Sequence, residues 1–184
     1  MVNKKKQAAS KKTSQWLKAF DRLADEDFKI TYFLFKFFLI LAVLYYSLIV
    51  VDFSALENVV ANGVGKALNL MTLGNLIFIQ SQPFMINSSC TGLQSVFVLF
   101  AVIFSLQLPK LSEKIKIFLA GSVMLFVINL IRLYFVLWAG VQFGISTAEL
   151  LHVVSWFVMT FAILGIWFFS VKKTAKIKHF NQLL

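Results

Sequence analysis

Four long apolar runs constrain the fold of this chain more than any other feature of its sequence. They cover about residues 30–51, 91–108, 117–141 and 150–171, and polar or basic residues separate them. A helix of about 20 residues crosses the hydrocarbon core of a bilayer. The composition agrees, since 59% of the 184 residues are hydrophobic and 21 are Phe. The sequence therefore predicts an all-α membrane protein, a polytopic bundle with four transmembrane helices.

The basic residues predict the orientation of these helices. Lysines and arginines are concentrated before residue 30, between the second and third runs, and after residue 171. Residues 52–90 and 142–149 contain only Lys66 as a basic residue. By the positive-inside rule we expect both termini in the cytoplasm and both poorly charged connections outside the plasma membrane. The net charge of +10 is therefore interpreted as topogenic, and no nucleic acid is expected as a partner.

The charge pattern divides the chain into three parts. Residues 1–29 are a predicted cytoplasmic basic segment that is retained, because no apolar core with a cleavage site precedes residue 30. Residues 30–171 form the membrane-embedded domain, with the extracytoplasmic loop at 52–90. Residues 172–184 are a predicted cytoplasmic basic tail.

The extracytoplasmic loop contains two predicted elements. A candidate capping box runs from Ser54 to Glu57, and the apolar residues that follow have helical spacing. This pattern predicts an extracytoplasmic amphipathic helix that ends at Gly74. Residues 75–86 alternate in part and contain Pro83, which predicts an extended segment or a short hairpin.

Three polar side chains stand out within the apolar runs. Cys90 is the only cysteine and lies at the outer end of the second run. Ser88 or Ser89 is expected to cap the helix there, and the positive end of the helix dipole is expected to favour a thiolate. Arg132 lies roughly 24 Å above the cytoplasmic end of the third run. His152 lies in the first turns of the fourth run. The topology therefore predicts that the three side chains meet near the outer face.

Each of these residues also has an ordinary structural interpretation. A lone cysteine at a helix end is more often a small buried hydrophobe than a nucleophile. A histidine near the interface is usually an amphipathic anchor. The ordinary role of Arg132 is a tie to a neighbouring carbonyl, although a guanidinium at membrane depth costs at least roughly 2.5 kcal/mol and generally faces a partner or a wet cavity. A pairing of Arg132 with the Cys90 thiolate at ~4 Å is favoured by about 4 kcal/mol before desolvation is subtracted, which makes a thiolate near neutral pH physically reasonable.

Supporting residues lie close to these three along the sequence. Asn129 precedes Arg132 by one turn and is expected to orient the guanidinium or to hold helices together. Glu149 precedes His152 by one turn and is a candidate to orient the imidazole, although a second capping box over residues 146–149 explains it better. Candidates for packing or substrate contact in the second run are Gln94 and Ser95.

These stretches resemble a known family. The sequence Cys-Thr-Gly-Leu-Gln-Ser from Cys90, the sequence Asn-Leu-Ile-Arg that ends at Arg132, and His152 at the start of the last run are similar to the exosortase/archaeosortase family of membrane transpeptidases. Thr91 and Gln94 look more like the archaeal branch. Members commonly have more than four spanning helices, which leaves an oligomer or a partner subunit possible for this shorter chain.

The resemblance implies a substrate class and a chemistry. The substrates would be surface proteins with a C-terminal motif, a transmembrane helix and a basic tail, cleaved outside the membrane and passed to an acceptor, which is a lipid in the archaeal branch. We hypothesise that Cys90 forms a thioester, His152 transfers protons and Arg132 stabilises the thiolate or the oxyanion. The backbone N–H groups of Thr91 and Gly92 are further candidate oxyanion donors. No cofactor and no metal are expected.

Other functions remain open at this point. An intramembrane cysteine protease would have the same site with water as the acceptor, and its product would carry a free carboxylate instead of a lipid. A noncatalytic assembly subunit would keep its function after the Cys90→Ala substitution. A transporter is disfavoured, because four spans with one deep charge offer little pathway unless copies assemble.

Overall fold

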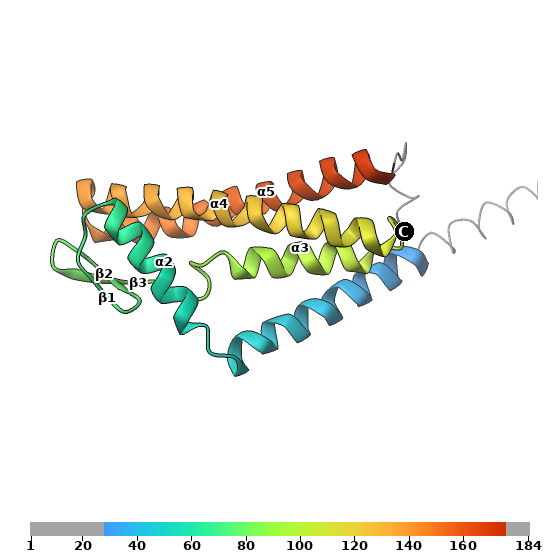
Figure 1. Cartoon of the computed structure of the whole chain (residues 1–184), viewed down its shortest axis with the longest axis horizontal. Coiled ribbons are helices and arrows are strands. Elements are labelled where there is room, and N and C mark those ends of the chain that lie inside the picture. The colour runs from blue at the N-terminus through green and yellow to red at the C-terminus, as the bar shows by residue number, and fades with distance from the viewer. Residues whose placement is uncertain (1–27, 176–184) are drawn as a thin grey trace, which may run out of the picture.

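The computed structural model describes residues 28–175 (Figure 1). Most of the predicted basic segment 1–29 and much of the tail 172–184 lie outside these residues. The elements in chain order are an N-terminal helix at Phe28–Val50, α2 at Ser54–Ala67, β1 at Thr72–Leu73, β2 at Leu76–Ile79, β3 at Gln82–Met85, α3 at Leu93–Ser105, α4 at Leu111–Phe143 and α5 at Ile145–Ala175.

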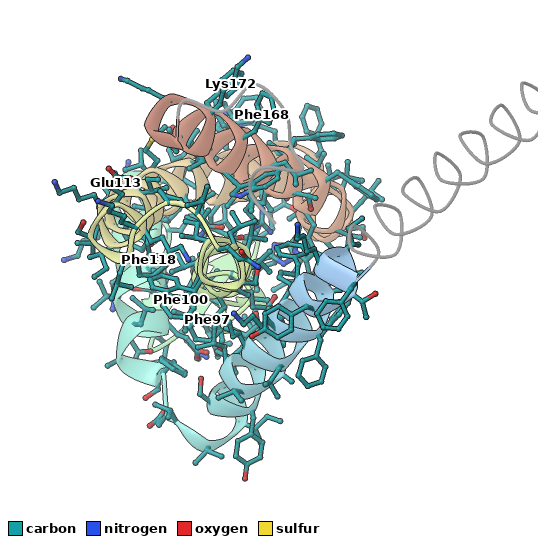
Figure 2. The ribbon with its side chains drawn as sticks, turned by 90° about the vertical axis from the view of Figure 1, so that its right-hand side faces the viewer. Phe97, Phe100, Glu113, Phe118, Phe168 and Lys172 are labelled. Atoms are coloured by element: carbon teal, nitrogen blue, oxygen red, sulfur yellow. The ribbon has the colours of Figure 1, made fainter. Side chains whose placement is uncertain are left out.

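The helices α4 and α5 form a long antiparallel pair, and α3 packs alongside them (Figure 1). The sheet and α2 lie at one end of this bundle, which we call the sheet end. Gly144 joins the two long helices and has a φ of 95°, a backbone conformation that residues with a Cβ rarely adopt. Figure 2 looks along the bundle from the other end and shows α3 surrounded by α4, α5 and the N-terminal helix. There Phe100 of α3 meets Phe118 of α4 edge to face, with ring centroids 5.2 Å apart.

Three of the described helices are long and apolar enough to cross a membrane. They are Phe28–Val50, Leu111–Phe143 and Ile145–Ser170. The predicted span at 91–108 instead contains a helix of 13 residues, α3, which rises about 20 Å and is shorter than a bilayer core. Gly92 precedes α3 in a left-handed conformation, and Leu106 follows it in an extended conformation. The predicted span at 91–108 therefore includes residues that are not helical at both of its ends.

The sheet contains three antiparallel strands in the order β1-β2-β3. Gln80 and Ser81 form the two-residue turn between β2 and β3, both with positive φ, as hairpin turns of this length prefer. The short hairpin predicted within residues 75–86 is therefore confirmed. The side chains of Ile77, Ile79 and Phe84 are buried, whereas Gln82 and Met85 are exposed.

The predicted capping box from Ser54 to Glu57 is wrong. The N-cap of α2 is Phe53, which makes no side-chain cap. Asp52 takes the role, because its carboxylate accepts the Ser54 N–H at 2.8 Å and the Ser54 hydroxyl at 3.1 Å. Glu57 is therefore free to accept hydrogen bonds from elsewhere in the fold.

The predicted end of the amphipathic helix at Gly74 is also wrong. The helix α2 ends at Ala67, and Asn69 follows with φ of 54°. The Leu70 N–H donates to the carbonyl of Gly65 at 2.9 Å, and the Asn69 N–H donates to Lys66 at 3.2 Å. These two bonds close the helix as a Schellman motif, which the apolar spacing does not reveal.

The buried side chains form two separate cores. The sheet-end core contains Val60, Ala61, Val64, Ile77, Ile79, Phe84, Ile86, Cys90, Leu133, Val136, Leu137 and Ala148. The distal core contains Leu99, Ile103, Leu106, Ile117, Leu125, Met159 and Ile163. Many large apolar side chains on the long helices are exposed, as expected of helices whose outer faces contact lipid tails.

Candidate active site

Cys90 lies in the loop between β3 and α3, not in the first turn of the helix. The Cys90 N–H donates to the Asn87 carbonyl at 2.8 Å and closes a turn. The N-cap of α3 is Gly92, with no side-chain cap, so the predicted cap by Ser88 or Ser89 is wrong. Cys90 therefore lies two residues before the N-cap of α3 and not within the helix.

Thr91 fixes the turn on which the thiol is carried. It is 1% exposed, and its hydroxyl donates to the Ser88 carbonyl at 2.7 Å. The same oxygen lies 3.4 Å from the Leu93 N–H at the start of α3. Thr91 therefore joins the turn to the helix through its side chain, in addition to the oxyanion role expected for its backbone.

The Cys90 thiol is buried among polar atoms. The side chain is 2% exposed, and its Sγ lies 3.7 Å from Nε2 of His152. Two acceptors are within reach of the thiol hydrogen, Oδ1 of Asn87 at 3.3 Å and the carbonyl of Met85 at 4.0 Å. The protonated thiol thus has hydrogen-bond partners in the resting structure.

Burial raises the pKa of the Cys90 thiol above its ordinary value. The backbone of Asn87 and the charge of Arg132 lower that pKa, but their effects are smaller than that of burial, and the charge of Glu57 raises it further. The expectation of a thiolate near neutral pH is therefore wrong for the resting site. Desolvation disfavours the anion, and the sequence does not reveal how deeply the sulfur is buried.

Arg132 is held by all three of its guanidinium nitrogens. Nε donates to the Ser155 hydroxyl at 2.6 Å, and Nη1 donates to Oδ1 of Asn129 at 2.9 Å. Nη2 lies 3.2 Å from Nδ1 of His152 and 3.3 Å from the carbonyl of the same residue. Arg132 is 8% exposed and lies beside His152, so it acts on the thiol through its charge and not through a direct hydrogen bond.

These contacts assign the tautomer of His152. A guanidinium only donates hydrogen bonds, so Nδ1 of His152 must accept the one from Arg132. The ring proton of the neutral imidazole is then on Nε2, which faces the Cys90 sulfur. In this resting arrangement the imidazole donates to sulfur and cannot take the thiol proton.

Asn129 connects the loop that carries Cys90 to the guanidinium of Arg132. The side chain is 0% exposed, and its Nδ2 donates to the carbonyl of Cys90 at 2.7 Å while its Oδ1 accepts from Arg132. A Cβ on Gly92 would lie 3.1 Å from three atoms of Asn129, and the φ of Gly92 is 85°. Glycine therefore permits this contact, and Asn129 orients Arg132 and also fixes the Cys90 backbone.

The structure does not bring Glu149 into the site. The helix α5 begins at Ile145, so Ser146 is already helical and the second predicted capping box is wrong. Glu149 is exposed, and none of the hydrogen bonds found among residues 28–175 involves its side chain. Arg132 and Cys90 contact the two ring nitrogens of His152, which leaves no ring nitrogen for the carboxylate.

Gln94 and Ser95 line a small cavity whose wall is partly polar and partly apolar. Its volume is about 160 Å³, and Arg132 forms part of its wall. The other lining residues come from the loop, α3, α5 and the N-terminal helix, and they are Tyr45, Ser89, Val98, Trp156, Met159, Thr160 and Ile163. Gln94 and Ser95 thus face a space that Arg132 borders, and Cys90 is not among its lining residues.

Sequence reasoning missed three residues of the site. Ser155 supports Arg132 and also donates to the His152 carbonyl at 2.8 Å. Asn87 contacts the thiol, and Glu57 accepts the Ser88 hydroxyl at 2.8 Å and the Asn75 amide at 3.2 Å. Proximity to His152 and Cys90 along the sequence was a signal for the first two, whereas only the fold brings Glu57 here.

Among the described residues, no group of three or more His, Cys, Asp or Glu side chains is placed to hold a metal ion. The groups that the structure brings together here are the buried thiol of Cys90, the buried guanidinium of Arg132 and the half-buried imidazole of His152. This combination is suited to nucleophilic attack by sulfur on a carbonyl, with proton transfer by the imidazole and charge stabilisation by the guanidinium.

Comparison with known proteins gives one family. The family described as transmembrane exosortase matches residues 28–168, which include the whole cluster around Cys90. No curated protein and no solved structure shows significant similarity to the chain.

Proposed function

The chain belongs to the transmembrane exosortase family, and from that premise we propose that it is a membrane-embedded cysteine transpeptidase. The observation that carries the proposal is the contact of 3.7 Å between the Cys90 sulfur and Nε2 of His152, with Arg132 on the other ring nitrogen. Its substrates are surface proteins with a C-terminal sorting signal, and its acceptor is a membrane lipid. The branch we favour is the archaeosortase-like one.

The proposed reaction has two steps. The Cys90 sulfur attacks the scissile carbonyl, an S–C bond forms, and the C–N bond breaks as His152 gives its Nε2 proton to the departing amine. The acceptor then attacks the thioester carbonyl and gives its proton to Nε2 of His152. The new bond from the acceptor to the carbonyl carbon forms, the S–C bond breaks, and His152 returns the proton to the departing Cys90 sulfur. Arg132 stabilises the negative charge on the carbonyl oxygen in both steps.

The resting tautomer of His152 requires an earlier event. Nε2 already carries a proton and faces the sulfur, because Nδ1 accepts from Arg132. We propose that the bound carbonyl oxygen of the substrate takes the Nη2–H of Arg132 away from Nδ1. The ring proton then moves to Nδ1 by exchange with water, and Nε2 accepts the thiol proton as the sulfur attacks. Substrate binding thus activates a thiol that is otherwise protonated.

The proposed orientation places the sheet end outside the cell and both termini in the cytoplasm. Its support is the predicted charge asymmetry, since the connections at the sheet end contain only Lys66 as a basic residue. A substrate whose own transmembrane helix lies beside the bundle would then present its outer end at the level of Cys90.

The test is a Cys90→Ala variant of the full chain in its native membrane. We expect processing of C-terminally anchored surface proteins to stop and the unprocessed proteins to copurify with the variant. Mass analysis of the wild-type product should show a lipid at the new C-terminus. Ser146→Ala, at an exposed site at the same end of the molecule, is the matched control and should process normally.

Two results would change the proposal. A free carboxylate on every product would replace transfer with hydrolysis. Normal processing by Cys90→Ala would show that the protein is a noncatalytic subunit.

A further inference from the structure

The strand β3 forms one edge of the sheet. In the strand order β1-β2-β3, its only strand partner among the described residues is β2. An edge strand has backbone N–H and C=O groups directed away from the sheet, and such groups pair readily with another extended chain. The N–H and C=O groups of β3 that point away from β2 therefore determine which hydrogen bonds an added strand can form.

The hydrogen bonds of β2 fix the direction of each backbone group on β3. The Phe78 N–H donates to the Met71 carbonyl at 3.0 Å, so the backbone groups of Phe78 point toward β1. Those of Ile77 point the opposite way, toward its partner Phe84 on β3. The next residue, Met85, therefore directs its N–H and C=O away from the sheet.

The outward groups of Met85 lie beside the proposed nucleophile. The Met85 carbonyl is 4.0 Å from the Cys90 sulfur. The ring of Phe84 packs edge to face on the His152 imidazole, with centroids 6.0 Å apart. The strand β3 therefore lies beside the thiol through the Met85 carbonyl and beside the imidazole through the ring of Phe84.

Pro83 limits the edge to a single outward donor. It is paired with Phe78 at a position where the strands exchange no hydrogen bonds, so the missing N–H of proline costs the sheet nothing. Its carbonyl points outward, as does that of Met85. The strand β3 thus presents one N–H group, that of Met85, between two outward carbonyl groups.

We propose that this edge binds the substrate segment before the scissile bond as an additional β-strand. The inference rests on the proposed function, because it assigns the place where the acyl donor docks. An extended peptide paired with Met85 has its next carbonyl close to Cys90, where attack occurs. Main-chain pairing provides affinity that depends little on side chains, as in other cases of strand addition to a sheet edge.

The test uses two alkylating probes on the full chain in phosphatidylcholine vesicles. One probe is acetyl-pentaalanine chloromethyl ketone, and the other is chloroacetone, which has the same reactive group without a peptide. In both reactions the Cys90 sulfur forms an S–C bond, the C–Cl bond breaks, chloride leaves and the thiol proton passes to the solvent. Because Cys90 is the only cysteine, mass analysis of the intact chain measures its modification alone. We expect the peptide probe to react faster by roughly fivefold for each main-chain hydrogen bond that it makes.

Two substitutions change the main-chain donors of the edge. Met85→Pro removes the outward N–H without removing a bond to β2, and it should lower the ratio of the two rates by about fivefold. Met85→Val retains the N–H and should retain the ratio. Pro83→Ala adds a second outward N–H and should raise the ratio, which keeps the test decisive if Met85→Pro does not fold.

Three results would overturn the proposal. The first is an equal rate for the two probes in the wild-type chain. The second is a ratio that is the same in Met85→Pro, or in Pro83→Ala, as in the wild type. The third combines two observations: cross-linked pairs of this chain that disappear in Met85→Pro, and a peptide probe that reacts no faster than chloroacetone. The edge would then join two copies of the chain. Failure of the proposed function reads out separately, as normal sorting by the Cys90→Ala variant.

Discussion

The helix α4 carries two buried cations, Lys114 in its first turn and Arg132 in its second half, and they have different surroundings. Arg132 at the sheet end is 8% exposed, and Lys114 at the distal end is 9% exposed. The amine of Lys114 donates to one backbone carbonyl, that of Leu106, at 2.5 Å. The guanidinium of Arg132 contacts three side chains, those of Ser155, Asn129 and His152.

The two cations are thus buried to a similar extent and differ in the groups that surround them. Lys114 ties the residue after α3 to the first turn of α4, which is the ordinary role considered for Arg132 from sequence. Arg132 instead contacts an imidazole that carries a transferable proton and an amide that holds the loop of Cys90. The partners of each charge, and not its depth, distinguish the two ends.

The largest effect is expected when the two cations are each replaced by the other type. Arg132→Lys should reduce the rate of substrate processing by at least about 100-fold, because one ammonium cannot contact three partners that surround a planar fork. Lys114→Arg retains a donor for the Leu106 carbonyl and should process at nearly the wild-type rate. Initial rates of processing in vesicles that contain the full chain measure both.

The two proteins must first be shown to reach the membrane in equal amounts. An equal loss of rate in both variants would contradict the comparison, since both charges would then serve only to hold helices together.

A second comparison contrasts Asn129 with Ser122, two turns earlier in α4. Asn129→Leu leaves the Cys90 carbonyl and a guanidinium N–H without their partner, so it should lower the free energy of unfolding by roughly 1–3 kcal/mol. It should also slow processing by about tenfold. The hydroxyl of Ser122 is buried and has no partner among the described residues, so Ser122→Ala should be neutral or slightly stabilising.

Unfolding in a denaturing detergent series, followed by circular dichroism, gives the two stabilities. A stable Asn129→Leu variant with full activity would show that the amide only fills space.

Features of the sequence that are local predicted much of this structure. Hydropathy located three helices of spanning length, and the partial alternation of residues 75–86 with Pro83 predicted an extended segment or a hairpin, of which the hairpin is observed. The spacing of Asn129 and Arg132 placed both on one face of one helix, where the structure joins them at 2.9 Å. The orientation derived from basic residues stays a prediction.

Two kinds of feature could not be predicted from local sequence. One depends on competition between hydrogen-bond acceptors for the same group, and the other depends on contacts between segments that are distant in the sequence. Ser54 and Glu57 match a capping box, in which Glu57 would accept the Ser54 N–H. In the structure Asp52 accepts that N–H, and Glu57 accepts hydrogen bonds from Asn75 and Ser88. The apolar run at 91–108 indicates hydropathy but does not indicate where the backbone is helical. The sequence therefore did not predict that α3 is short. The burial of the thiol depends on packing from distant segments, and with it the direction of its pKa shift.

The pH dependence of thiol alkylation tests this burial. Burial raises the pKa of Cys90, so the rate of reaction with iodoacetamide should still be rising above the pH at which an ordinary thiol is fully ionised. The charge of Arg132 lowers that pKa, so Arg132→Gln should move the profile to higher pH. Lys114→Gln, at the distal end, should leave the profile in place. A profile that levels off near neutral pH in the wild type would contradict the structure.

The smallest effect is expected at Glu149, which compares informatively with Glu57. Both acids lie at the sheet end, but the carboxylate of Glu57 accepts from Ser88 and Asn75 and so supports the loop before Cys90. Glu57→Ala should therefore slow processing several-fold. Glu149 is exposed and lies one turn from His152 without contacting it, so Glu149→Gln should change the rate by less than about twofold. A large loss in Glu149→Gln alone would mean that the imidazole changes partners during the reaction and that the resting contact with Arg132 is not the catalytic one.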